Sequence, residues 1–173
     1  MYSQRYVDYL IHFHGDRDYF ECHEILEEHW KSEPTPDQVW VGLIQLAVGL
    51  YHQRRENFSG AKKMFNSSLS ILQQVPDRVH ALALDETQLS QVLRDLIEAA
   101  HQHKPYQSVN LPLIDQELIQ SCEAECARMG LEFGKPSDCS NLELLHRHTR
   151  RDRSEVINER EQQLLRKRQS RLR

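Results

Sequence analysis

Glycine and proline are scarce in this sequence, with only six of each among 173 residues, and 39% of the residues are apolar. This composition excludes collagen-like and low-complexity disordered chains. The chain also lacks the run of roughly 20 apolar residues that a membrane-spanning helix needs. Residues 1–8 do not show the basic and then apolar pattern of a signal peptide. We therefore expect a globular protein that stays in the cytoplasm.

Several motifs of known chemistry are missing as well. There is no glycine-rich phosphate loop, no Gly-x-Ser-x-Gly elbow and no dinucleotide fingerprint. Of the four cysteines, Cys122 and Cys126 are separated by three residues, and Cys139 follows after a gap of twelve residues, which is not a standard zinc spacing. In the cytoplasm we expect all four, including Cys22, to be reduced thiols. No metal and no cofactor is predicted.

Charge is distributed unevenly along the chain. Residues 140–173 contain ten Lys and Arg against five Asp and Glu, a local charge of +5, so residues 1–139 carry −9. We expect a helical domain at 1–139 and a basic helical extension at 140–173, and we expect truncation at Ser140 to leave the thermal midpoint nearly unchanged. The extension could bind nucleic acid phosphates. Apolar residues recurring about every seven positions also allow self-association or docking to a partner protein: Ile157, Leu164, Leu165 and Leu172.

Helix-capping pairs divide the rest of the chain. Asp18 with Glu21, Thr35 with Gln38, Asp85 with Gln88 and Ser140 with Glu143 each match the pattern of an N-cap and third helical residue, and Pro36 suits a first helical position. With the apolar periodicity, they predict helices at about 3–14, 18–32, 36–56, 60–74, 86–103 and 112–129, and another from about 141. No segment is typical of a strand. The predicted fold is an all-α bundle of six or seven helices.

The segment 36–56 is apolar almost all the way round, which predicts a helix at the centre of the bundle. Gly42 and Gly49 lie seven residues apart on one face, where they let a neighbouring helix approach closely. The short link to 60–74 predicts an antiparallel hairpin. Gly49, Ala61 and Phe65 resemble the small, small and aromatic positions of a tetratricopeptide unit, although His52 stands where a Tyr is expected.

The most distinctive segment is 18–30. At 100° per residue, Tyr19, His23, Leu26 and Trp30 share one arc of a helix, so a histidine lies within the apolar face. Glu27 follows His23 by one turn and can contact it. A zinc protease motif would need His at position 27, so that class is excluded.

His23, Glu27 and Trp30 form the pattern His-x-x-x-Glu-x-x-Trp, and Gly42 to Ala47, Tyr51-His52 and Gly60-Ala61 form a second block. Together they resemble the domain-of-unknown-function 309 family of bacterial and archaeal proteins, over about residues 5 to 75. The resemblance implies an all-helical fold and supplies no activity.

Two hypotheses of function remain for the motif. In the first, the protein is a structural or protein-interaction module in which His23 and Glu27 form a buried pair that positions Trp30. In the second, the protein is an enzyme or metal-binding protein whose site combines His23 and Glu27 with Gln45 and His52 from the central helix. Nucleic-acid binding through the basic extension is a further alternative. The sequence names no substrate, partner or oligomeric state.

Overall fold

The computed structural model describes residues 1–150 and 161–166, and within these residues the chain forms helices and no strands. The named helices are α1 (Gln4–His14), α2 (Tyr19–Ser32), α3 (Gln38–Arg54), α4 (Phe58–Gln74), α5 (Pro76–Ala81), α6 (Glu86–His101), α7 (Gln116–Arg128), α8 (Leu142–Leu145) and α9 (Arg147–Arg150). Residues 161–166 are also helical and exposed. The all-α prediction is confirmed. Among these residues, no helix is both long and apolar enough to cross a membrane.

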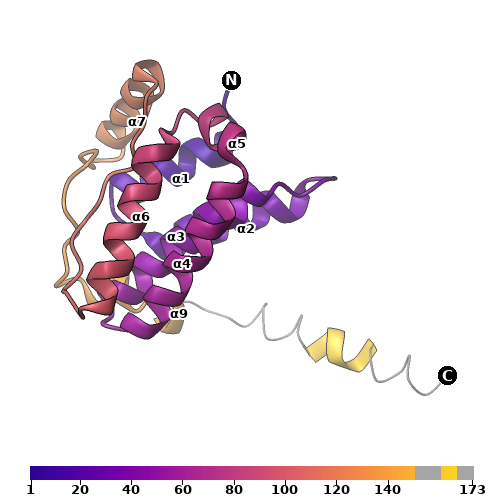
Figure 1. Cartoon of the computed structure of the whole chain (residues 1–173), viewed down its shortest axis with the longest axis vertical. Coiled ribbons are helices and arrows are strands. Elements are labelled where there is room, and N and C mark those ends of the chain that lie inside the picture. The colour runs from indigo at the N-terminus through magenta and orange to yellow at the C-terminus, as the bar shows by residue number, and fades with distance from the viewer. Residues whose placement is uncertain (151–160, 167–173) are drawn as a thin grey trace.

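Helix α3 is the central element of the bundle, as its apolar sequence predicts. It packs between α2 and α4, while α6 covers α4, and α1 contacts α2 and α7. Figure 1 shows α6 and α7 on one side of the bundle and α2 on the other. Leu43, Leu46 and Leu50 of α3 are fully buried. Every residue of α3 except Gln38 is buried or half-buried, so the other polar residues of α3 lie within or beside the packing of the bundle.

Close contact across the hairpin of α3 and α4 depends on Gly42 and Gly49. A Cβ atom at Gly49 would lie 2.5 Å from the Phe65 ring, and one at Gly42 would lie 2.5 Å from Leu72 Cδ2. The hydroxyl of Ser68 donates a hydrogen bond of 2.7 Å to the carbonyl of Gly42. The earlier residue of α3, Gly42, lies against the later residue of α4, Leu72, and Gly49 lies against Phe65, so the two helices are antiparallel.

Two of the four predicted caps hold and two are displaced. Asp18 Oδ1 accepts from the N–H of Glu21 at 3.0 Å, and Asp85 Oδ1 accepts from that of Gln88 at 2.8 Å. The prediction of Thr35 as a cap is wrong, because Asp37 caps α3 through the N–H of Val39 at 3.0 Å and Pro36 precedes the helix. Ser140 is likewise replaced by Asn141, which caps Leu144.

Two other helices also differ from the prediction. Helix α7 begins at Gln116 rather than near 112, because residues 112–114 pair with the segment before α6: the N–H of Asp85 donates to Pro112, and that of Ile114 donates to Ala83. The predicted long helix from 141 is broken at His146 into α8 and α9.

Candidate functional site

The motif residues occupy one side of α2 with graded burial. Tyr19 and Leu26 are fully buried. The side chain of His23 is 25% exposed, at the edge of the apolar arc rather than inside it. Its Nε2 lies 2.7 Å from Glu27 Oε2, and the other oxygen of Glu27 accepts from Lys31 Nζ at 2.5 Å. Partial burial raises the pKa of Glu27, but Lys31 and His23 outweigh burial and lower its pKa overall. The carboxylate is therefore held ionised between two donors.

Helices α2 and α3 run antiparallel, which brings His23 to His52. The rings of Phe20 and Tyr51 are 6.0 Å apart, and the rings of His29 and Trp40 are 4.9 Å apart at the other end. Between these helices lies a cavity of about 200 Å³, which we name the imidazole pocket. The residues that line it are Tyr19, Phe20, His23, Val48, Tyr51, His52, Arg55 and His148.

Burial and the neighbouring Arg55 lower the pKa of His52, which favours a neutral ring. Asn57 Nδ2 lies 3.2 Å from His52 Nδ1 and donates to it when that nitrogen is unprotonated. The imidazole pocket thus combines apolar side chains from both helices with nitrogen-bearing groups.

The other predicted residues occupy separate positions. Glu27 supports His23 through their hydrogen bond, and neither Trp30 nor Gln45 lines the imidazole pocket. Trp30 Nε1 and Gln45 Oε1 are both buried, and neither has a hydrogen-bond partner among the described residues. The structure therefore brings His23 and His52 to one cavity and leaves Trp30 and Gln45 in the helix packing.

One wall of the imidazole pocket comes from the C-terminal segment, residues 141–150. His148 bonds the hydroxyl of Tyr51 through Nδ1, and its backbone N–H donates to the same oxygen at 3.2 Å. Arg55 lies 3.3 Å from both His146 Nδ1 and His148 Nε2. A guanidinium can only donate, so both imidazoles accept from Arg55 and must be neutral in this arrangement.

Two further contacts hold the C-terminal segment on the bundle. Arg147 Nη2 lies 3.3 Å from Asp18 Oδ2, whose side chain is 4% exposed, and Leu144 is buried. Truncation at Ser140 would remove all of these contacts, so we now expect it to lower the thermal midpoint. Of the basic residues on which the nucleic-acid alternative depends, these lie outside the described residues: Arg151, Arg153, Arg160, Lys167, Arg168, Arg171 and Arg173.

Sequence reasoning missed the buried polar residues that join distant segments. Arg17 is 1% exposed, and its guanidinium donates to the carbonyls of Lys135 and Val109 and to Asn110 Oδ1. Arg54 donates to the carbonyl of Arg17, and its guanidinium lies 4.7 Å above the ring of Tyr19. No local pattern distinguishes these arginines from solvated ones, because their hydrogen-bond partners lie 37 to 118 positions away in the chain.

Metal binding has little support in the described part of the chain. No group of three or more His, Cys, Asp and Glu residues there could hold a metal ion. Cys122 and Cys126 are buried, and Cys139 is exposed. Burial raises the pKa of the Cys122 thiol to about 11, which disfavours the thiolate that a metal requires.

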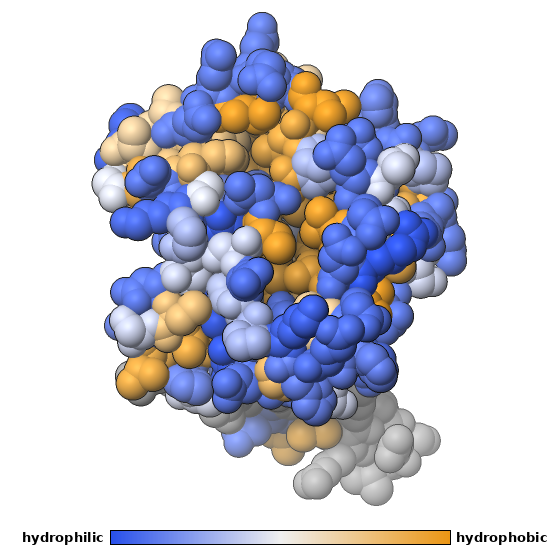
Figure 2. Space-filling model, turned by 60° about the vertical axis from the view of Figure 1, so that its left-hand side comes forward, coloured by the Kyte–Doolittle hydropathy of each residue, from blue (hydrophilic) through white to orange (hydrophobic). Residues whose placement is uncertain are grey.

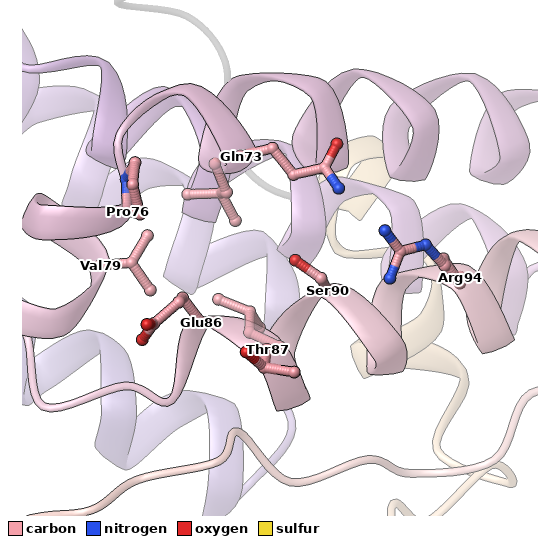
Figure 3. A pocket seen from close by; sticks show the side chains of 9 residues that line it. Gln73, Pro76, Val79, Glu86, Thr87, Ser90 and Arg94 are labelled. Atoms are coloured by element: carbon pink, nitrogen blue, oxygen red, sulfur yellow. The ribbon is translucent and has the colours of Figure 1, made fainter.

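A further cavity of about 260 Å³ lies between the end of α4, α5 and the start of α6. Figure 3 shows Gln73 of α4 across from Ser90 and Arg94 of α6. Most of its polar groups, including Glu86, Thr87 and Arg94, are exposed. They are therefore solvated, and this cavity is a weaker candidate than the imidazole pocket.

The chain belongs to the family described as domain of unknown function (DUF309), which matches residues 6–64. It is also similar to "Uncharacterized protein YpuF" from Bacillus subtilis (strain 168), at 44% identity over 173 residues and 99% of each chain. No solved structure matches it. The predicted family is confirmed.

Proposed function

We propose that this protein is a helical protein-interaction module, and that the imidazole pocket receives one apolar side chain of a partner protein. The observation that carries this proposal is the combination of apolar walls from Phe20, Val48 and Tyr51 with the polar groups of His23, His52 and Arg55 in one cavity. Burial of an apolar side chain contributes about 1.5–3 kcal/mol. The polar groups supply direction and specificity.

The size of the imidazole pocket favours a side chain over a whole metabolite. Its volume of about 200 Å³ is below the roughly 300–1,000 Å³ typical of small-molecule sites. A single anchor side chain in a small pocket is a common way for one protein to hold another. The permanently charged Arg55 at this cavity favours a carboxylate next to that anchor.

The pair of His23 and Glu27 has a positioning role in this proposal. Glu27 is hydrogen-bonded to His23 and Lys31, so it fixes the orientation of the imidazole beside the cavity. The enzyme alternative receives less support, because Glu27 does not line the cavity and is already held by Lys31.

Selection of random short peptides displayed on phage tests the proposal. Wild-type protein should enrich peptides with one large apolar residue next to Asp or Glu. Val48→Trp fills the imidazole pocket and should abolish this enrichment. Ile119→Trp, at a half-buried position of α7, is the matched control and should keep it, with the fold of both variants checked by circular dichroism. Enrichment that survives Val48→Trp, or that shows no apolar anchor, would refute the proposal.

A further inference from the structure

A larger cavity lies between the end of α3, the C-terminal half of α6 and the segment that follows α6. Its volume is about 440 Å³, within the roughly 300–1,000 Å³ range of small-molecule sites. We name it the Gln53 cavity. The residues that line it are Gln53, Val92, Asp95, Leu96, Ala99, Lys104, Pro105, Gln107 and Val109. Figure 2, which turns this side of the bundle forward, shows apolar side chains in the hollows between hydrophilic ones.

Gln53 is the feature that points to a ligand. The residue is 2% exposed, and its buried Oε1 has no hydrogen-bond partner among the described residues. Leaving a buried acceptor unpaired costs about 1–3 kcal/mol. A group that enters the cavity and donates one hydrogen bond to Gln53 would remove that cost.

A single water molecule is a poor occupant of this cavity. Water takes about 30 Å³ in the liquid, far less than the 440 Å³ available. The walls around Gln53 are mainly apolar, from Val92, Leu96, Ala99 and Val109. An apolar ligand would pack against these aliphatic side chains and gain dispersion contacts that water does not supply.

The charges of the lining define the rest of the ligand. Lys104 provides a cation that suits a carboxylate. The carboxylate of Asp95 also lines the cavity, and its Oδ1 accepts from Gln91 Nε2 at 2.9 Å, so a second negative group on the ligand would be repelled.

We propose that the Gln53 cavity binds a small apolar monocarboxylic acid that carries one O–H or N–H donor. The donor bonds Gln53 Oε1, the apolar body packs against Val92, Leu96 and Val109, and the carboxylate lies near Lys104. This site is separate from the imidazole pocket and does not depend on the function proposed for it.

Three related probes test each part of this proposal by calorimetry and NMR titration of the full chain. 4-Hydroxyphenylacetate has the donor, the apolar body and the carboxylate, whereas phenylacetate lacks the donor and 4-hydroxyphenylethanol lacks the carboxylate. We expect 4-hydroxyphenylacetate to bind about tenfold more tightly than phenylacetate, the effect of one neutral hydrogen bond. It should also bind more tightly than 4-hydroxyphenylethanol, and this second difference should shrink at high salt.

Matched variants connect the binding to the cavity. Gln53→Met keeps the size of the side chain and should abolish the preference for the hydroxylated acid. Gln45→Met removes another buried, unpaired Oε1 of α3 that does not line this cavity, and it should leave the preference unchanged. Lys104→Met, at an exposed position where folding is not at risk, should abolish the preference for the carboxylate. The proposal is overturned if the wild-type protein binds no probe at millimolar concentration, or binds all three equally.

Discussion

His14 should make this bundle sensitive to acid. Its ring is fully buried, and it is stacked on Phe133 with the ring centroids 4.4 Å apart. Nδ1 lies 2.9 Å from the carbonyl of Leu10, and Nε2 accepts from the N–H of Leu111 at 3.0 Å. Only the neutral ring with its proton on Nδ1 can make both hydrogen bonds. Protonation at Nε2 would break the bond to Leu111 and leave a charge in the core.

The size of the effect follows from the shifted pKa. Burial lowers the pKa of His14 from 6.5 to about 4, with the carbonyl of Leu10 opposing and Arg17 adding to the decrease. The unfolded chain therefore binds a proton more readily than the folded one at pH values between these two. The stability that depends on neutral His14 is fully present above pH 6.5 and is lost as the pH falls toward 4. By linkage, about 2–3 kcal/mol disappears between pH 7.5 and 4.5.

Urea denaturation of the wild type and of His14→Gln at both pH values measures this loss. Glutamine keeps a donor and an acceptor but does not titrate, so the other ionisable groups cancel in the comparison. The wild type should lose about 2–3 kcal/mol more free energy of unfolding on acidification than the variant does. Exposed His80→Gln is the control and should behave as the wild type. Equal losses in His14→Gln and the wild type, or a folded-state titration of His14 near pH 6.5 by NMR, would refute this reasoning.

Three further predictions concern the packing, the C-terminal segment and the motif. Gly49→Ala should lower the free energy of unfolding by about 1–2 kcal/mol in urea denaturation, because overpacking against the fully buried Phe65 outweighs the gain of about 1 kcal/mol in helix propensity. Adding Phe65→Leu should relieve this overpacking. A Gly49→Ala variant as stable as the wild type would contradict the close contact. A chain that ends at Ser140 should have a lower thermal midpoint than the full chain, because residues 141–150 make the contacts with Asp18, Tyr51 and Arg55. A chain that ends at Arg150 should match the full chain. Equal midpoints for the chain that ends at Ser140 and the full chain would show that these contacts contribute nothing. Glu27→Gln should lower the free energy of unfolding by less than about 1 kcal/mol in urea denaturation, because the carboxylate is 35% exposed and solvent screens its ion pairs. The same variant should weaken peptide selection at the imidazole pocket. A decrease above about 2 kcal/mol would instead indicate a structural role.

Much of the fold is predictable because its signals are local. Asp18 and Asp85 each lie three residues before the N–H that they cap, and the apolar character of α3 is visible in one unbroken segment. The start of α3 is not predictable in this way. Glu33 accepts from the N–H of Asp37 and from Trp40 Nε1, and this turn makes Asp37 rather than Thr35 the cap.

The candidate site is predictable only in part, for the same reason. The contact of His23 with Glu27 is one helical turn, so the sequence is sufficient to expect it. The proximity of His23 and His52 depends on how α2 is aligned along α3. The short connection between the two helices favours an antiparallel arrangement but does not fix this alignment. His148 comes from 96 positions beyond His52, and the Gln53 cavity combines α3 with residues 92–109. Nothing in the local sequence distinguishes these residues from ordinary surface residues.

The extent of the family match bears on which relatives should share these sites. Residues 6–64 include every residue that lines the imidazole pocket except His148, but only Gln53 of the residues that line the Gln53 cavity. The remaining lining residues come from outside that segment: His148 for the imidazole pocket, and residues such as Val92, Leu96, Lys104 and Val109 for the Gln53 cavity. A protein that shares only residues 6–64 thus shares most of the imidazole pocket but only one residue of the Gln53 cavity. A relative similar over its full length, such as the protein from Bacillus subtilis, is therefore the appropriate comparison for both binding experiments.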